Sequence, residues 1–158
     1  MNTPAFSVCV YCGSRNGIQP EYADVARQVG TWIGQHNGQL VYGGGNNGLM
    51  GLVAQATADA GGRVVGIIPK ALQTKENTRT ACTELYVVNT MHERKHMMAE
   101  RADVFLPCLV ASAPLKNFLR CGLGASWATT TNPLAYSTHK AITTVYCNLR
   151  KTACNKAF

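Results

Sequence analysis

Short apolar segments alternate with longer segments of helical periodicity up to about residue 106. The short segments have the length of buried strands, and in the longer ones apolar residues recur every three or four positions. Strands are predicted over 7–11, 39–42, 64–68, 85–88 and 104–106, and helices over 20–36, 46–60 and 91–101. Strands joined by helices of this length predict an α/β fold, a Rossmann-like, doubly wound parallel sheet with helices on both faces.

This pattern stops after Pro107. All eight Asp and Glu residues lie at or before Asp103, whereas residues 108–158 hold none, together with six Lys or Arg and four of the seven cysteines. Codons that encode this tail can also be read one base out of frame, without a stop codon through residue 158, and then begin LPGGIGTFEEFFEVWTWRQL. The shifted reading has acidic residues, helical periodicity and a glycine-rich turn, which the actual tail lacks.

One nucleotide deleted in the Pro107 codon explains this break. Agreement of charge, periodicity and turn residues in a shifted frame rarely arises by chance, although a tail poor in acids that happens to decode well is the alternative. We therefore divide the chain into a Rossmann-like nucleotide-binding part over 1–107 and an out-of-frame tail over 108–158, which truncates the fold. Little regular structure is expected in the tail beyond an accidental helix near 115–121.

Charge has a different meaning in the two parts. Residues 1–107 carry nine Lys and Arg against eight acids, so the formal net charge of +7 comes almost wholly from the tail. This balance gives no reason to expect nucleic acid or an anionic membrane as a partner. The sequence has no apolar run of about 18 residues, and residues 1–6 lack the pattern of a signal peptide. We therefore expect a cytoplasmic protein with reduced cysteines.

A glycine-rich stretch lies between the second predicted strand and the helix that follows it. Residues 43–48, GGGNNG, fit the pattern G-x-G-x-x-G. Glycines at such a place let backbone N–H groups approach a phosphate at the start of a helix. A dinucleotide site would also need an acid after the next strand, which here ends Ile-Ile-Pro-Lys. The stretch favours a mononucleotide phosphate site, with a merely tight turn as the alternative.

The segment His92-Glu93-Arg94-Lys95-His96 matches the H-E-x-x-H pattern of zinc enzymes. A third ligand is not evident, because the tail offers only His139, and two cations inside the motif would oppose a dication. We therefore expect neither a metal nor a cofactor. Cations are unfavourable at the start of a helix, so Arg94 and Lys95 are explained if they hold a phosphate or a carboxylate. A solvated basic face is the alternative.

A C-x-x-C pair, Cys9 and Cys12, is the remaining motif of this kind. On an extended strand these two positions face opposite sides of the sheet, and the sequence has no second pair. Small core residues are therefore a better interpretation than metal ligands.

Four segments together resemble a known family. They are CVYCGSRNG (9–17), VYGGGNNGLMG (41–51), VVGIIPKAL (64–72) and MHERKHMMAERADVFL (91–106). They are similar to the Lonely Guy (LOG) cytokinin riboside 5′-monophosphate phosphoribohydrolases, a family often mislabelled as lysine decarboxylase. The resemblance stops with the last segment and resumes in the shifted frame, where PGGIGTFEE matches the family signature PGGxGTxxE.

The resemblance implies a homodimeric enzyme that hydrolyses the N-glycosidic bond of adenine-type nucleoside 5′-monophosphates, such as AMP or a cytokinin riboside monophosphate. The products are the free base and ribose 5-phosphate. Position by position, it implies that Arg94 is catalytic and has Lys95 beside it. The other implied contacts to substrate are to the phosphate, from Ser14, Gly44 and Gly45, and to the rest of the substrate pocket, from Glu76 and Met91.

The resemblance also implies that the partner of Arg94 is a glutamate of the shifted signature. At the positions of its two glutamates this chain has Lys116 and Asn117. Cleavage of a glycosidic bond builds positive charge on the ribose, and a carboxylate is needed to stabilise it or to orient the attacking water. We therefore expect this polypeptide to be inactive, with a nucleotide-binding module without catalysis as the alternative.

Overall fold

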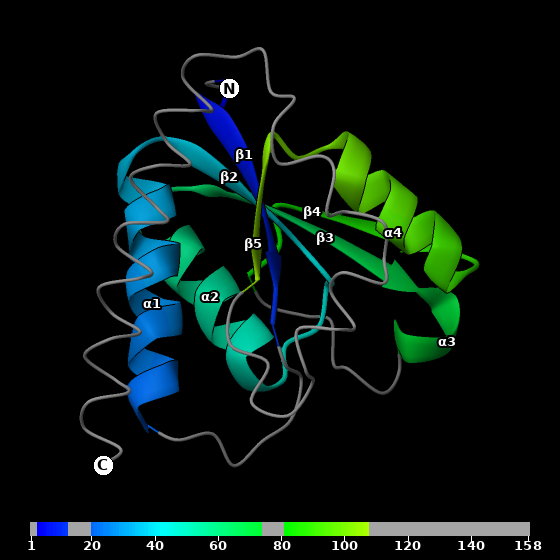
Figure 1. The fold of residues 1–158 in the computed structure, drawn as a ribbon, viewed down its shortest axis with the longest axis horizontal. Coiled ribbons are helices and arrows are strands. Elements are labelled where there is room, and N and C mark those ends of the chain that lie inside the picture. The colour runs from blue at the N-terminus through cyan, green and yellow to red at the C-terminus, as the bar shows by residue number, and fades with distance from the viewer. Residues whose placement is uncertain (1–2, 13–19, 74–80, 108–158) are drawn as a thin grey trace.

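The computed structural model describes residues 3–12, 20–73 and 81–107, apart from the side chains of Glu21 and Pro107. Strands and helices alternate along them (Figure 1). The elements are β1 (Phe6–Tyr11), α1 (Pro20–Gln35), β2 (Gly38–Tyr42), α2 (Gly48–Asp59), β3 (Arg63–Pro69), α3 (Lys70–Gln73), β4 (Glu84–Val88), α4 (Met91–Glu100) and β5 (Val104–Pro107). The predicted alternation is confirmed. The predicted tail and its accidental helix lie outside the described residues.

The element bounds differ from the prediction in a few places, each with a local cause. Helix α2 begins at Gly48 instead of residue 46, because Asn47 is extended as the N-cap and Gly48 has a φ of 61°. Helix α1 ends at Gln35, one residue before the predicted end, and Asn37 takes a φ of 55°, the left-handed conformation that terminates helices. The short α3 was not predicted, because four residues are too few to show a helical period.

The five strands form one parallel sheet with the order β4-β3-β2-β1-β5. The chain moves outward from β1 to β4 and then crosses back to place β5 on the other side of β1, so the strand order reverses between β1 and β5. Tyr11 pairs with Pro107 at the carboxyl ends of these two strands. Ligands of open α/β sheets bind outside the carboxyl ends of the strands at such a reversal. Tyr11 and Pro107 therefore lie at the edge where a ligand is expected.

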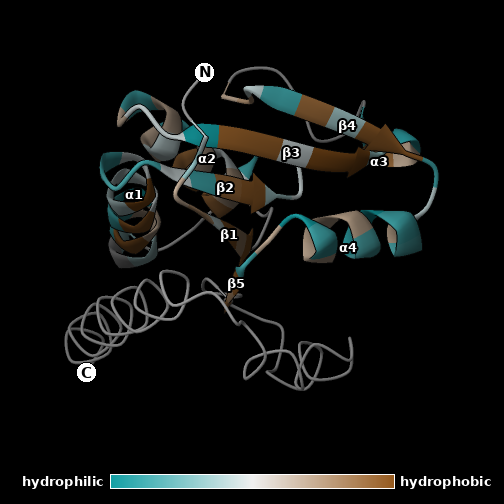
Figure 2. Ribbon diagram, turned by 90° about the horizontal axis from the view of Figure 1, so that it is seen from above, coloured by the Kyte–Doolittle hydropathy of each residue, from teal (hydrophilic) through white to brown (hydrophobic). Residues whose placement is uncertain are grey.

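Each face of the sheet has its own hydrophobic core. Helices α1 and α2 cover one face, whose core includes Val8, Leu40 and Val64, and α4 lies on the opposite side of the sheet (Figure 2). The two helices on the first face approach closely because α1 has glycines at the contact: a Cβ on Gly30 would lie 2.5 Å from the carbonyl oxygen of Val53 in α2. The expectation of helices on both faces is confirmed. None of the helices in the described ranges has the length and apolar character needed to cross a bilayer.

The two cysteines of the C-x-x-C pair belong to different cores. Cys9 is fully buried in the core on the α4 side, whereas Cys12 packs against the core on the side of α1 and α2. The prediction that they face opposite sides of the sheet is confirmed.

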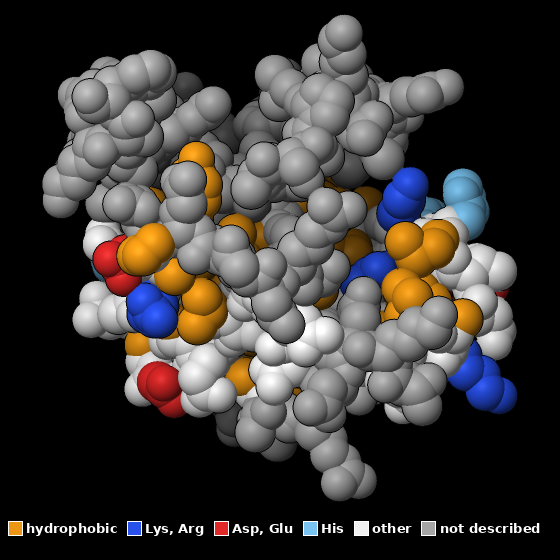
Figure 3. Space-filling view, turned by 90° about the horizontal axis from the view of Figure 1, so that it is seen from below, with side chains coloured by type: hydrophobic (Ala, Val, Ile, Leu, Met, Phe, Trp, Pro, Cys, Tyr) orange, Lys and Arg blue, Asp and Glu red, His pale blue; other side chains and the backbone are white. Residues whose placement is uncertain are grey.

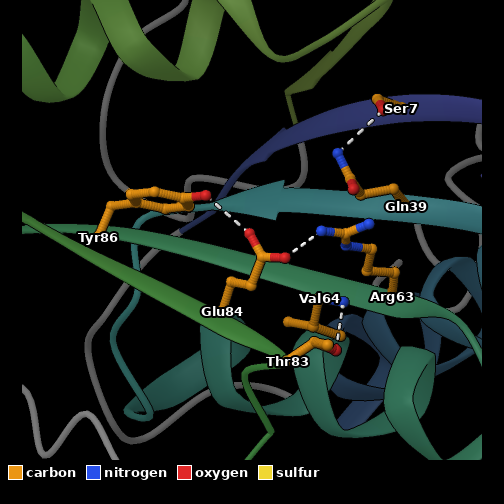
Figure 4. A network of polar contacts seen from close by, with 7 residues as sticks. All are labelled: Ser7, Gln39, Arg63, Val64, Thr83, Glu84 and Tyr86. Atoms are coloured by element: carbon orange, nitrogen blue, oxygen red, sulfur yellow. Dashed lines mark hydrogen bonds and ion pairs between the residues drawn. The ribbon is translucent and has the colours of Figure 1, made fainter. Parts of the chain in front are cut away.

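A row of polar side chains crosses the α4 side near the amino ends of the strands (Figure 4). Gln39 donates to the Ser7 hydroxyl at 3.1 Å, Arg63 pairs with Glu84, and the Tyr86 hydroxyl donates to Glu84 at 2.7 Å. The hydrogen bond from Tyr86 and the charge of Arg63 hold the pKa of Glu84 below its usual range. Because these groups are partly exposed, the row orients neighbouring strands more than it stabilises the fold.

Stability should fall at alkaline pH because of Cys9. Burial raises the pKa of its thiol from 9.0 to about 12, so above pH 9 the unfolded chain releases a proton that the folded chain retains. The contribution of the protonated Cys9 thiol to the free energy of unfolding is complete below about pH 9 and is lost as pH rises towards 12. The loss amounts to about 2 kcal/mol by pH 10.5. Urea unfolding followed by circular dichroism at several pH values measures the loss. In the Cys9→Ala variant we expect a shallower dependence, and an unchanged slope would contradict the assignment to Cys9.

Candidate functional site

The guanidinium of Arg94 lies against the glycine-rich turn that follows β2. Its Nη2 donates to the carbonyl oxygen of Gly43 at 2.5 Å, and its Nε donates to the carbonyl oxygen of Ile67 in β3 at 3.0 Å. Its Nη1 lies 3.7 Å from the sulfur of Met91, one turn earlier in α4. Arg94 therefore joins the carboxyl-terminal parts of two neighbouring strands to the first turn of α4.

The start of α4 is fixed by a capping box. The Thr90 hydroxyl accepts from the Glu93 N–H at 3.1 Å, and the Glu93 carboxylate accepts from the Asn89 N–H at 2.9 Å. This reciprocal bonding satisfies N–H groups that the helix leaves without partners. It also holds the turn that carries Arg94.

The same capping box accounts for the glutamate of the H-E-x-x-H pattern. Glu93 binds the backbone before the helix, while His96 pairs with Glu100 at 3.2 Å on the exposed surface. Within the described ranges, no three His, Cys, Asp or Glu residues lie together in a way that could hold a metal ion.

The glycine-rich turn is buried between the strands it joins. Gly43, Gly44 and Gly45 are all buried, and Gly44 has a φ of 74°, a conformation that favours glycine. Tyr42, just before the turn, has its hydroxyl 3.0 Å from the Cys82 sulfur. Burial raises the pKa of both groups, so both are neutral at pH 7. The contact between Tyr42 and Cys82 thus supports the turn where it leaves β2.

The structure brings some of the predicted site residues together. Gly44 and Gly45 lie in the turn that Arg94 contacts, and Met91 touches Arg94. Lys95, the next residue in α4, is exposed. Ser14 and Glu76 lie outside the described residues. On the face shown in Figure 3, the described Lys and Arg side chains lie apart from one another, with hydrophobic side chains between them.

Because a cation is unfavourable at the start of a helix, the sequence predicted that Arg94 binds a phosphate or a carboxylate. In the structure, two backbone carbonyl oxygens accept hydrogen bonds from its guanidinium. Carbonyl oxygens carry partial negative charge, which explains how a cation is accommodated in the first turn of a helix. Sequence reasoning singled out the triplet that contains Gly43 but missed Ile67 as a residue of the site.

The fold and this arrangement define a Rossmann-like α/β protein in which an arginine is held at a glycine-rich turn, at the carboxyl edge of a parallel sheet. Residues 50–108 match a family model described as possible lysine decarboxylase. Over 99 residues, 63% of the chain, the sequence is 46% identical to cytokinin riboside 5′-monophosphate phosphoribohydrolase LOG2 of Arabidopsis thaliana. It is 44% identical over 103 residues to the probable enzyme LOG4 of Oryza sativa subsp. japonica. Over its matched residues the chain is therefore similar to the LOG phosphoribohydrolases.

The match does not extend over the whole length of these relatives. It covers 46% of the Arabidopsis protein and 45% of the rice protein, so the chain spans about half the length of the curated relatives it matches.

Solved structures support the fold. The molybdenum cofactor carrier protein of Chlamydomonas rheinhardtii superimposes with a TM-score of 0.63 at 18% identity, over 80% of this chain and 74% of that protein. The molybdenum cofactor binding protein of Rippkaea orientalis gives a TM-score of 0.61 at 20% identity, over 90% of this chain and 98% of that protein. At these identities the likeness concerns the fold alone.

Proposed function

We propose that the intact form of this protein is a cytoplasmic, homodimeric phosphoribohydrolase of nucleoside 5′-monophosphates. One observation carries the proposal: Arg94 is held over the glycine-rich turn inside a segment that is 46% identical to a named phosphoribohydrolase. The substrate is AMP or a cytokinin riboside monophosphate. Its phosphate lies at the turn, bound by Ser14, Gly44 and Gly45, while Glu76, Met91 and Lys95 line the rest of the pocket.

We further propose that residues 108–158 are out of frame and that this polypeptide is therefore inactive. One observation supports a break near Pro107: the family match ends at residue 108. Pro107 itself lies beside Tyr11, where the strand order reverses. In the shifted frame the signature directly follows β5. Its catalytic carboxylate would therefore lie near the carboxyl edge of the sheet, where ligands of such sheets bind.

The proposed reaction needs both a cation and a carboxylate. Water adds to C1′ of the ribose, the bond from C1′ to the base nitrogen breaks, and the base leaves with a proton while ribose 5-phosphate remains. Positive charge develops on the ribose during cleavage, which a carboxylate stabilises. Arg94 can orient the phosphate but cannot supply that negative charge. Glu93, its neighbour in sequence, is engaged in the cap of α4.

Product analysis tests the reaction type. Inserting one base in the Pro107 codon gives what we call the frame-restored protein. With AMP, we expect it to release adenine and ribose 5-phosphate, separated by liquid chromatography. Adenosine and inorganic phosphate would instead identify a phosphatase and overturn the proposal.

A second candidate is a nucleotide-binding module without catalysis. It is favoured by the fact that Arg94 and the glycine-rich turn are both formed by residues before the break. Calorimetry of this chain with AMP distinguishes it, since the module binds AMP and releases no adenine.

A further inference from the structure

The backbone conformation of Gly43 does not require a glycine. Among the described residues, the glycines with positive φ are Gly44, Gly48 and Gly61. Gly44 needs its identity for its φ of 74° and for its packing, since a Cβ there would lie 3.1 Å from the Cβ of Ile68. Gly43 has a backbone that an alanine can adopt without strain. Its lack of a side chain must therefore have another cause.

The guanidinium of Arg94 occupies the space that a side chain at position 43 would fill. A Cβ built on Gly43 would overlap Nη2 of Arg94 and lie 3.0 Å from its Cζ, while the next atom is the Met50 sulfur at 3.3 Å. The obstacle is thus the tip of a long side chain from α4. Such a tip can be displaced, whereas backbone atoms cannot.

We propose that Gly43 is a positioning residue for Arg94. Its missing side chain leaves the space in which the guanidinium reaches the Gly43 carbonyl oxygen with Nη2 while Nε binds that of Ile67. Two bonds from a planar guanidinium to acceptors on two different segments fix both its place and its orientation. Gly43 and Gly44 therefore have different roles: Gly43 leaves room for Arg94, and Gly44 makes the turn.

A methyl group at position 43 should move the guanidinium by an ångström or more. A misplacement of about 1 Å in a reacting group can cost on the order of 10² in rate. This consequence for the rate rests on the proposed hydrolase function. The displacement itself does not, and it can be measured in the chain as it stands.

Hydrogen exchange of the arginine side chain measures the displacement. In the 15N-labelled chain we expect the Nε–H of Arg94, bonded to Ile67 at 3.0 Å, to exchange slowly with water. Its NMR signal is assigned by its loss in the Arg94→Lys variant. In the Gly43→Ala variant we expect exchange at least about tenfold faster. Unchanged exchange would overturn the proposal even if the protein proves to be no hydrolase.

A double-mutant cycle in the frame-restored protein measures the effect on rate. We expect Gly43→Ala alone to lower kcat/KM for AMP about 10²-fold. Added to Arg94→Ala, the same change should lower it less than about twofold, because the group it displaces is gone. Equal losses in both backgrounds would show that Gly43 does not act through Arg94. If neither protein hydrolyses AMP, the proposed function fails while the exchange result still decides the role of Gly43.

Stability measurements keep the proposal testable if Gly43→Ala does not fold. Removing the guanidinium frees the space, so the double variant with Gly43→Ala and Arg94→Ala should fold even if Gly43→Ala alone does not. Failure of both variants to fold would overturn the proposal. Gly61→Ala is the matched control, because Gly61 has a φ of 83° and a Cβ there would meet nothing within 4 Å. It should lower stability through backbone strain and leave Arg94 exchange and kcat/KM unchanged.

Discussion

Inserting one base in the Pro107 codon is expected to raise the rate of AMP hydrolysis by at least about 10², and up to about 10⁴, over that of the present chain. Loss of an essential acid or base costs that much in enzymes generally. On the proposed frameshift, the change would place a glutamate pair at positions now held by Lys116 and Asn117. Adenine release by the two purified proteins under identical conditions gives the ratio.

A three-base insertion at the same codon is the matched control for this experiment. It adds one residue at this position but keeps the present frame, so it should give no gain in adenine release. The frame hypothesis would be abandoned if the present chain hydrolysed AMP as fast as the folded, frame-restored protein. Sequencing the DNA around the Pro107 codon provides an independent check.

Replacing Arg94 by alanine in the frame-restored protein should lower kcat/KM for AMP by on the order of 10²–10³. The guanidinium is held at the glycine-rich turn by bonds to Gly43 and Ile67, so its charge is placed at the ligand edge of the sheet before substrate arrives. Arg94→Lys keeps the charge but not the planar, forked donor, and should recover only part of the rate. Steady-state kinetics of the two variants test this.

Three controls separate this effect from general damage around α4. Lys95→Ala removes the neighbouring, exposed charge and should reduce the rate less than Arg94→Ala does. The His92→Ala and His96→Ala variants should remain active, and zinc chelators should not inhibit them. Near-normal hydrolysis by Arg94→Ala would refute the catalytic assignment, and inhibition by a chelator would restore the zinc hypothesis.

Periodicity in the sequence was enough to predict the strands and helices that surround the site. Strand-length apolar runs and the stop signal at Asn37 depend on the residues themselves, so they can be recognised locally. The acceptors of Arg94 could not be found in this way, because a backbone carbonyl oxygen belongs to every residue and carries no sequence signal. Only the pairing of β2 with β3 brings the carbonyls of Gly43 and Ile67 within reach of one side chain.

The carboxylate of Glu93 illustrates how one stretch of letters can satisfy two unrelated chemical patterns. The start of α4 has a Thr-x-x-Glu capping box, and histidines lie before and after its glutamate, so the sequence also matches the metalloprotease pattern. In the structure the glutamate caps the helix. In a metalloprotease the glutamate must instead face water bound to the metal. Homologues that keep the threonine and the glutamate but have other residues in place of His92 and His96 are therefore expected to keep their fold and activity, and pattern searches for zinc proteases will pick out only those members that happen to carry both histidines.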